Sequence, residues 1–232
     1  MASLRTARTI LFFLLSFLLG WNGNSVRSLA QDFAFANDVA SLDNSSMPNL
    51  RMQTLGGKQF WTDHVWRYQW RIQKNAVTGH FRLLDPANVR HAWGSQEHCQ
   101  EELDRLNLLS TQIPPDRVVL FAHGLMRTSG SLAGLAKRVQ SETGATPILF
   151  EYASSRSSIG DHAAALRELI EKLPVGVDGK GPRIDFVAHS MGNIVIRRAI
   201  GDWQRGPDPS QALSRLGRMV MLGPPNQGAT IA

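Results

Sequence analysis

Between residues 117 and 222, short apolar runs alternate with segments of helical periodicity. The apolar runs cover 117–122, 147–152, 184–188 and 219–222. Continuous apolar runs of this length are typical of parallel strands that are buried on both faces. The apolar residues between them recur at spacings of three and four, as they do in amphipathic helices. We therefore predict an α/β fold with a mainly parallel sheet, right-handed crossovers and flanking helices.

An antiparallel hairpin is predicted ahead of this region. Apolar and polar residues alternate over 66–73, and this period of two marks a strand with one buried face. We expect a turn at 74–75 and a partner strand over 77–84. Interleaved aromatic and basic residues could suit single-stranded nucleic acid, but the strand period favours rings in the core and arginines on a solvated face. A polar surface helix is expected over 95–108.

The first thirty residues have the pattern of a secretory signal peptide. Arg5 and Arg8 precede an apolar run at 10–21, and small residues near Ala30 suit cleavage after it. The run is shorter than the ~20 apolar residues of a membrane-spanning helix, although an uncleaved anchor is the alternative. We expect 1–30 to be a signal peptide or anchor. The protein would then be secreted, periplasmic or anchored in a membrane through residues 10–21.

Charge and composition exclude several classes of protein. The formal net charge is +6, but half of that excess lies in residues 1–30, which hold three arginines and no acid. A nucleic-acid-binding protein would carry a denser basic patch. The single cysteine, Cys99, excludes an internal disulfide and a zinc site of several thiolates, and we expect it to be buried. The sequence shows no metal-ligand cluster and no glycine pattern for dinucleotides or phosphates, so we expect no metal and no cofactor.

The domain organisation follows from these patterns. Residues 31–57 are rich in Asn, Asp, Ser and Ala and show little periodicity, which suits a flexible segment leading into a domain. We expect that domain to span 58–232.

The strand expected at 184–188 runs directly into Ala188-His189-Ser190-Met191-Gly192 and then into an apolar helix. A serine at such a sharp strand-to-helix turn presents its hydroxyl above the sheet, and the residues two before and two after it must be small. Ala188 and Gly192 meet this requirement. The amino end of the helix also points at the serine, where unpaired N–H groups favour developing negative charge. Ser190 is therefore the candidate nucleophile, and the alternative is an ordinary turn serine that caps a helix.

With two further motifs, this turn resembles the α/β-hydrolase superfamily in its lipase-like and esterase-like branch. His123-Gly124-Leu125 follows the run at 117–122, like the HG loop that supplies part of the oxyanion hole in these lipases. The segment 222–228, Leu-Gly-Pro-Pro-Asn-Gln-Gly, is similar to their Pro-containing loop. The resemblance covers about 117–228. It implies that Ser190 accepts the acyl group and that the backbone N–H groups of Leu125 and Met191 bind the oxyanion.

The acid and the general base of the triad are missing from their expected places. In this fold the order is Ser, then Asp or Glu, then His, whereas all seven histidines precede Ser190. The resemblance implies that His123 and His189 lie beside the site without acting as the base. Four aspartates are left without a catalytic assignment. Asp185 lies within a predicted strand and points to a structural role, Asp161 is best placed as an N-terminal helix residue, and neither Asp202 nor Asp208 is assigned a role. We expect the chain to be incomplete at its C-terminus, with the later strands of the fold missing.

These features predict an exported serine hydrolase of carboxylic esters that forms an acyl-enzyme at Ser190. Its expected partners are an ester or lipid substrate and a membrane surface, and nucleic acid is not among them. Two alternatives stay open. One is a secreted pseudo-hydrolase that binds an acyl or glycan ligand without turnover, and the other is acyl transfer to an alcohol or amine in place of water.

Overall fold

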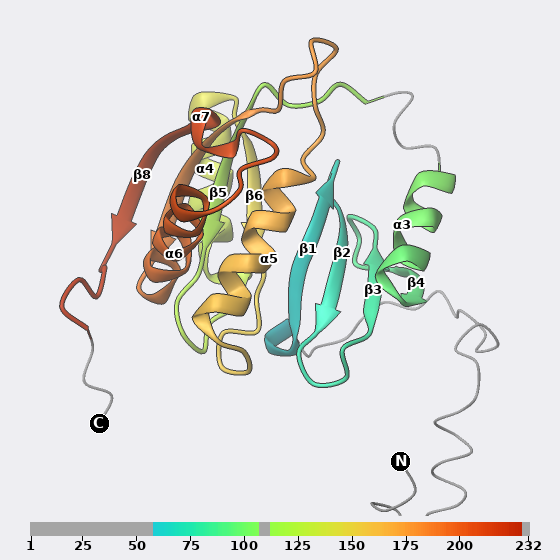
Figure 1. The fold of residues 1–232 in the computed structure, drawn as a ribbon, viewed down its shortest axis with the longest axis horizontal. Helices are drawn as coiled ribbons and strands as arrows, with labels where there is room; N and C mark the ends of the chain where they lie inside the picture. The colour runs from blue at the N-terminus through green and yellow to red at the C-terminus, as the bar shows by residue number, and fades with distance from the viewer. Residues whose placement is uncertain (1–57, 107–111, 229–232) are drawn as a thin grey trace, which may run out of the picture. The chain divides into compact units, whose positions relative to one another are not determined.

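The structure is a computed structural model that describes residues 58–106 and 112–228. The signal segment at 1–30 and the flexible segment predicted at 31–57 lie outside the described residues. The described strands form two four-stranded sheets, one antiparallel and one parallel, with helices beside them (Figure 1). The predicted α/β class, with a parallel sheet and flanking helices, is confirmed.

The parallel sheet has the strand order β6-β5-β7-β8. Its strands are β5 (Arg117–Ala122), β6 (Thr146–Phe150), β7 (Arg183–His189) and β8 (Leu216–Leu222). The two central strands, β5 and β7, each bury five consecutive residues, as expected for strands covered on both faces. β6 ends at Phe150, so the last two residues of the apolar run at 147–152 lie in the loop that follows the strand.

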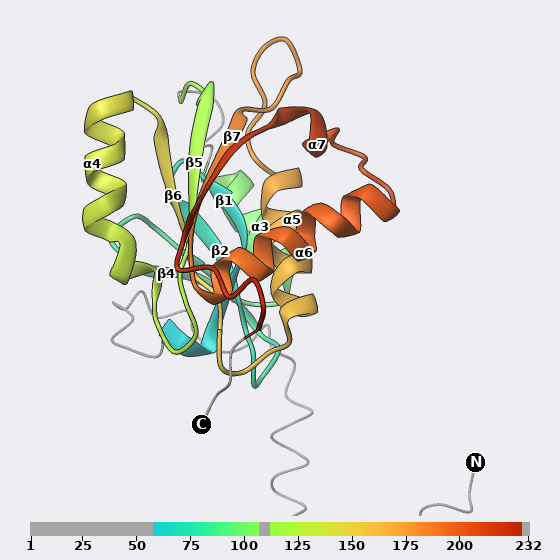
Figure 2. The same cartoon turned by 90° about the vertical axis from the view of Figure 1, so that its left-hand side faces the viewer.

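Helices cover both faces of this sheet. A short 3-10 turn (Ser129–Leu132) leads into α4 (Ala133–Thr143) on one face, and α5 (Ile159–Glu171) and α6 (Met191–Arg205) lie on the other (Figure 2). Alternate residues of β5 supply the two cores. Val119 and Phe121 pack in the core on the α4 side, and Val118 and Leu120 pack in the core that includes α5 and α6.

The order of connections creates a switch point at the carboxyl ends of β5 and β7. From β5 the chain crosses to β6 through α4, and from β6 it crosses back past β5 to β7 through α5. The loops that leave β5 and β7 therefore diverge to opposite faces of the sheet. In open α/β sheets, ligands bind in the crevice outside such a switch point. These two loops carry His123 and Ser190.

The antiparallel sheet contains β1 (Trp61–Arg67), β2 (Trp70–Asn75), β3 (Phe81–Leu84) and β4 (Arg90–Gly94), after a 3-10 turn at Lys58–Phe60. The prediction of one continuous strand over 66–73 is wrong. Tyr68 and Gln69 form a turn with φ values of 51° and 72°, the left-handed backbone that a two-residue hairpin turn requires. Glycine and asparagine usually mark such turns. Because this turn has neither, the alternation of apolar and polar residues continues through it and gives no sign that the strand ends. The predicted hairpin is thus part of a larger sheet.

Helix α3 (Gln96–Arg105) packs against this sheet. Its amino end is capped by Ser95, whose Oγ accepts the N–H of His98 at 3.1 Å. Cys99 is fully buried in the core of the antiparallel sheet, as predicted, and burial raises the pKa of its thiol to about 12. Across residues 58–106 and 112–228, no helix combines the length and apolar character needed to cross a membrane.

One buried carboxylate, Asp63 of β1, joins the antiparallel sheet to the loop after β6. Its N–H donates to the Glu151 carbonyl at 2.9 Å, and its Oδ2 accepts the Glu151 N–H at 2.7 Å. Its Oδ1 accepts from Gln73 Nε2 at 2.7 Å, and Gln73 Oε1 in turn accepts from the Arg82 guanidinium. Burial raises the pKa of Asp63 despite these hydrogen bonds. The two sheets therefore share a hydrogen-bonded polar centre.

Replacing Asp63 with alanine should lower the free energy of unfolding by about 2–4 kcal/mol, because the buried Glu151 N–H and the Gln73 amide would both lose their acceptor. Asp63→Asn keeps one acceptor oxygen and should cost less. Urea unfolding followed by circular dichroism measures both. The exposed Glu142→Ala on α4 is the control, and an equal cost for it and Asp63→Ala would contradict this role.

Candidate functional site

Ser190 occupies the tight turn between β7 and α6. Its φ of 49° and ψ of −118° lie outside the regions that ordinary residues adopt, and such backbone strain costs about 1–3 kcal/mol. The side chain makes no capping hydrogen bond to α6. The alternative of an ordinary helix-capping serine therefore does not describe this residue, and its hydroxyl is left for other interactions.

Backbone and side-chain hydrogen bonds hold this turn on both sides. The Ser190 N–H donates to the Leu222 carbonyl at 2.9 Å, which ties the turn to the end of β8. The Ser190 carbonyl accepts from both the N–H and the Nδ2 of Asn193, each at 3.0 Å. Asn193 is buried and was missed from the sequence. The one sequence feature that could have indicated its role is a polar amide in the first turn of an apolar helix.

Two glycines allow the loops after β5 and β7 to meet. A Cβ at Gly192 would lie 2.8 Å from the carbonyl carbon of Ala122, the last residue of β5. A Cβ at Gly124 would lie 2.8 Å from His189 Nδ1 and 3.2 Å from Ser190 Cβ. Neither position has room for a side chain without movement of its neighbours. The structure thus brings the predicted HG loop directly against Ser190.

The two candidate oxyanion donors lie at the ends of these loops. Met191 is the first residue of α6, where a backbone N–H has no acceptor within the helix. Leu125 lies in the turn closed by the Arg127 N–H and the Gly124 carbonyl at 3.2 Å. Among the hydrogen bonds between described residues, neither the Leu125 nor the Met191 N–H is a donor. Both groups are therefore available to an incoming oxygen.

The side chain of His123, the first residue of the HG loop, is fully buried. Its ring stacks on Tyr152 with centroids 4.1 Å apart, and its Nδ1 donates to the Gly124 carbonyl at 2.9 Å. Its Nε2 lies 3.5 Å from Oε1 of the buried Glu151. Glu151 Oε2 accepts from the N–H and Oγ of Ser129 at 3.1 and 2.5 Å. These contacts orient the loop. The role of Glu151 was not predicted from the sequence, where it is simply the one acidic residue of an apolar run.

The unassigned aspartates have structural partners. Asp185 accepts the Arg218 N–H at 2.6 Å and pairs with Arg117, as expected for a residue within a strand. Asp161 completes a capping box at the start of α5, also as expected. Asp202 pairs with arginines of its own helix, and Asp208 accepts backbone N–H groups at the start of α7 (Ala212–Arg215).

Within residues 58–106 and 112–228, no triad base is placed at the serine hydroxyl. Among the described residues, no imidazole or carboxylate makes a hydrogen bond to Ser190 Oγ, and His189 is brought beside Gly124 instead. Ser190 does not line either of two pockets of about 550 Å³ that the described residues form. No cluster of three or more His, Cys, Asp or Glu side chains in the described ranges could hold a metal ion.

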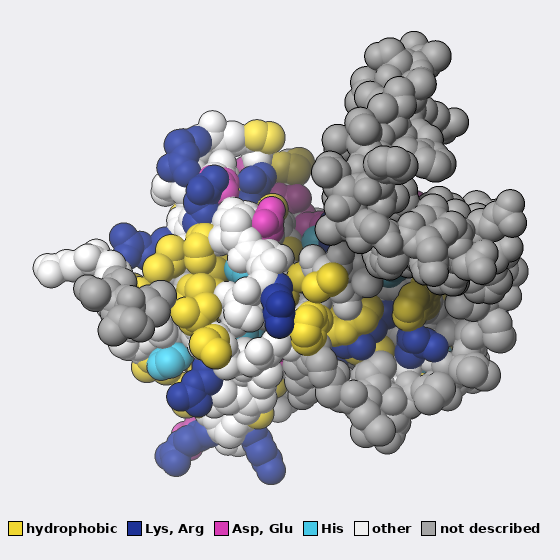
Figure 3. All heavy atoms as spheres, turned by 90° about the horizontal axis from the view of Figure 1, so that it is seen from below, with side chains coloured by type: hydrophobic (Ala, Val, Ile, Leu, Met, Phe, Trp, Pro, Cys, Tyr) yellow, Lys and Arg dark blue, Asp and Glu magenta, His cyan; other side chains and the backbone are white. Residues whose placement is uncertain are grey.

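Apolar side chains are exposed near the carboxyl ends of the parallel strands. Leu125 and Met126 of the HG loop are 39% and 69% exposed, and Val220 and Met221 near the end of β8 are 52% and 47% exposed. Figure 3, which views the molecule from below, shows hydrophobic side chains gathered on this face. An apolar ligand could contact this surface.

His162 of α5 lies in the core beside these loops. Its ring centroid is 4.8 Å from that of Tyr152, and neither ring nitrogen has a hydrogen-bond partner of good geometry. Burial lowers the pKa of His162 to about 4, although the neighbouring Asp161 opposes this shift. The imidazole is therefore neutral in the folded protein at neutral pH.

Replacing Gly192 with alanine should destabilise the protein by about 1–3 kcal/mol, because the new methyl group would overlap the Ala122 carbonyl. Gly134→Ala on α4 is the matched control, since a Cβ at this position would have no neighbour within 4 Å, and it should be neutral or slightly stabilising. Thermal unfolding of both variants measures the difference. Equal melting temperatures would contradict the close approach of α6 to β5.

Because His162 is neutral in the folded protein, we expect the free energy of unfolding to decrease as the pH falls from 6.5 to 4. In this range the unfolded chain binds a proton at His162 that the folded protein does not, so stability falls as the pH drops, by up to about 3 kcal/mol. His162→Phe should remove this component. Unfolding titrations at several pH values measure it, with the exposed His98→Gln as control. An unchanged pH profile in His162→Phe would show that His162 does not cause the loss.

The sequence matches no model of a known protein family and no curated protein. We therefore infer a function from the geometry at the ends of β5 and β7.

Proposed function

We propose that this chain is an α/β-hydrolase-like serine hydrolase of carboxylic esters with Ser190 as its nucleophile. The backbone of Ser190, at φ 49° and ψ −118°, is the observation that carries the proposal. Strain of this kind persists only where the surrounding structure enforces it, and it clusters at functional sites. It also matches the sharp strand-to-helix turn that exposes a nucleophilic serine above a sheet.

The chemistry is acyl transfer through a covalent intermediate. Ser190 Oγ attacks the ester carbonyl carbon, and the N–H groups of Leu125 and Met191 stabilise the oxyanion that forms. The C–O bond to the alcohol then breaks, the alcohol leaves with a proton, and water hydrolyses the acyl-enzyme. Loss of one oxyanion donor typically costs ~3 kcal/mol of transition-state stabilisation.

Acylation by this chain should be slow. A serine hydroxyl is weakly nucleophilic at neutral pH unless a base accepts its proton. No described imidazole or carboxylate is hydrogen-bonded to Ser190 Oγ, so the serine would rely on its strained position and on the oxyanion donors. Reactive probes are therefore better suited to this chain than ordinary substrates.

The exposed apolar side chains at the same edge support an acyl group as the part of the substrate that binds. Leu125 and Met126 flank the proposed oxyanion site, and Val220 and Met221 follow on β8. Burying apolar surface provides about 25 cal/mol per Å² of contact, so longer acyl chains should bind more tightly. Lipid substrates, a membrane surface and export remain predictions from the sequence.

Ser190→Ala should abolish covalent labelling by a fluorophosphonate ester probe, because the attacking oxygen is removed. Ser141→Ala, which changes an exposed serine at the end of α4, should label like the unchanged chain. Intact-mass spectrometry over a time course measures the fraction labelled. Labelling of Ser190→Ala at the original rate would contradict the assignment.

The second candidate function is a pseudo-hydrolase that binds an acyl or glycan ligand without turnover. The absence of a hydrogen-bonded base at Ser190 Oγ, among the residues described, favours it. This function would give saturable binding of a fatty acid that Ser190→Ala retains, together with no labelling of the unchanged chain. Stoichiometric labelling that depends on Ser190 would favour the hydrolase.

A further inference from the structure

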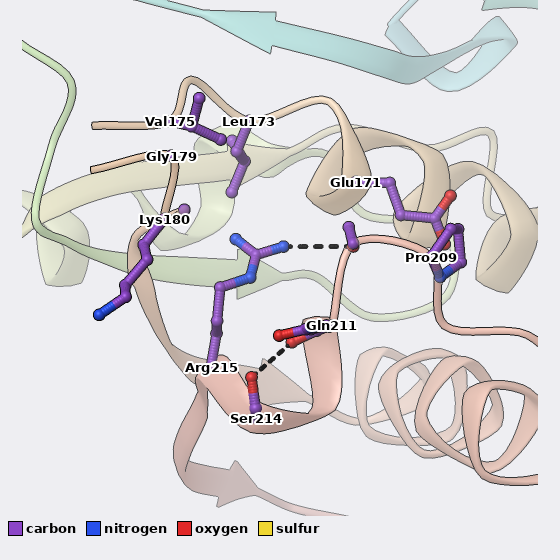
Figure 4. A pocket seen from close by; sticks show the side chains of 11 residues that line it. Glu171, Leu173, Val175, Gly179, Lys180, Pro209, Gln211, Ser214 and Arg215 are labelled. Carbon is purple, nitrogen blue, oxygen red and sulfur yellow. Dashed lines mark hydrogen bonds between the residues drawn. The ribbon is translucent and has the colours of Figure 1, made fainter. Parts of the chain in front are cut away.

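A polar pocket lies near the amino-terminal ends of the parallel strands, whereas Ser190 lies at their carboxyl ends. The carboxyl end of β7 leads to Ser190, whereas this pocket is lined by Gly179 and Gly181 of the loop before β7 and by Ser210, Gln211 and Ser214 around α7. Its volume is about 550 Å³. Figure 4 shows the Arg215 side chain extending into this pocket from the α7 side.

Arg215 makes unusually weak contacts for a half-buried guanidinium. Its Nη2 lies 3.4 Å from both the Ile170 carbonyl and Ser210 Oγ, which are long hydrogen bonds. Its Nε is buried with no hydrogen-bond partner. A planar guanidinium offers five N–H donors, so most of the donor capacity of Arg215 is unused within the described part of the chain.

The nearby carboxylates are engaged elsewhere. Glu171 also lines the pocket, but its Oε1 accepts from Trp203 Nε1 at 2.8 Å and lies 3.9 Å from Arg167. The Asp208 oxygens accept the backbone N–H groups that begin α7. Both acids raise the pKa of Arg215 at longer range but only partly offset the effect of burial, which lowers it. The guanidinium thus faces the pocket without a carboxylate at ion-pair distance among the described residues.

The loop before β7 lies close to the guanidinium. A Cβ at Gly181 would lie 2.8 Å from Arg215 Cζ, so the guanidinium lies directly against the backbone of this loop. Lys180 stands on the rim of the pocket with a mostly exposed side chain, 4.0 Å from Asp178. A second positive charge is therefore within the lining of the same pocket.

We propose that this pocket binds the phosphate group of a small soluble molecule, with Arg215 as its principal ligand. The guanidinium fork matches two oxygens of an oxyanion. The hydroxyl of Ser210 and the amide of Gln211 line the same pocket and can serve further oxygens, which a phosphate has and a carboxylate lacks. The Ser214 hydroxyl already donates to the Gln211 carbonyl at 2.8 Å. This site is independent of the chemistry proposed for Ser190.

The competing explanation is a purely structural Arg215. Its Nη2 approaches the carbonyl of Ile170 in the last turn of α5, where basic side chains commonly stabilise a helix end. That role predicts lower stability when Arg215 is replaced, but no binding of phosphate by the unchanged protein.

Isothermal titration calorimetry of the 232-residue chain with sodium phosphate, at ionic strength held constant with sodium chloride, tests the proposal. The unchanged chain should show saturable binding. Arg215→Gln should weaken it about tenfold or more, since a charge-assisted hydrogen bond is worth at least that factor. The exposed Arg138→Gln on α4 is the matched control and should bind as the unchanged chain does, as should Ser190→Ala.

If circular dichroism shows that Arg215→Gln does not fold, Ser210→Ala replaces it and should weaken binding several-fold. Three results would overturn the proposal: no saturable heat with the unchanged chain, equal affinity in the folded Arg215 or Ser210 variant, or equally tight binding of acetate. Co-sedimentation with phosphatidic acid vesicles distinguishes the source of the phosphate. Arg215-dependent vesicle binding without binding of free phosphate would overturn the assignment to a soluble molecule.

Discussion

The close approach of α6 to β5 is the constraint on which the candidate site depends. Because no side chain fits between Gly192 and the Ala122 carbonyl, the amino end of α6 lies directly against a central strand of the sheet. The chain can enter the helix at this distance only through a sharp turn, and Ser190 takes up the backbone strain. The same tight geometry leaves room for the HG loop only because residue 124 is also a glycine.

A buried polar centre couples the two sheets to this loop. Asp63 hydrogen-bonds the backbone of Glu151, and the Glu151 side chain lies beside His123 and Ser129 at the two ends of the loop after β5. Buried polar groups of this kind are costly unless they are satisfied, so they tolerate few arrangements. The antiparallel sheet therefore contributes to the position of the candidate oxyanion donors, although it carries none of them.

The two edges of the parallel sheet have different chemistry. The carboxyl edge combines a strained serine, unpaired backbone N–H groups and exposed apolar side chains, and it suits an acyl group whose carbonyl develops negative charge. The amino edge has an underused guanidinium in a polar pocket and suits an anion. Since the strands separate the two edges, a ligand at one need not exclude a ligand at the other.

Local patterns in the sequence determined the four parallel strands, the helices between them, the capping role of Asp161 and the turn at Ser190. Each depends on neighbouring residues: apolar runs, helical spacing, or small residues on both sides of a serine. The turn at Tyr68 and Gln69, the strand β4, and the roles of Glu151, Asn193 and Arg215 emerged only from the tertiary structure. A left-handed turn without glycine has no clear local signature, and a buried polar side chain acquires its role from partners distant in the sequence, as Asp63 does from Glu151. The physical reason is that periodicity records which face of an element is buried, whereas the satisfaction of a buried charge or hydrogen bond depends on which elements meet.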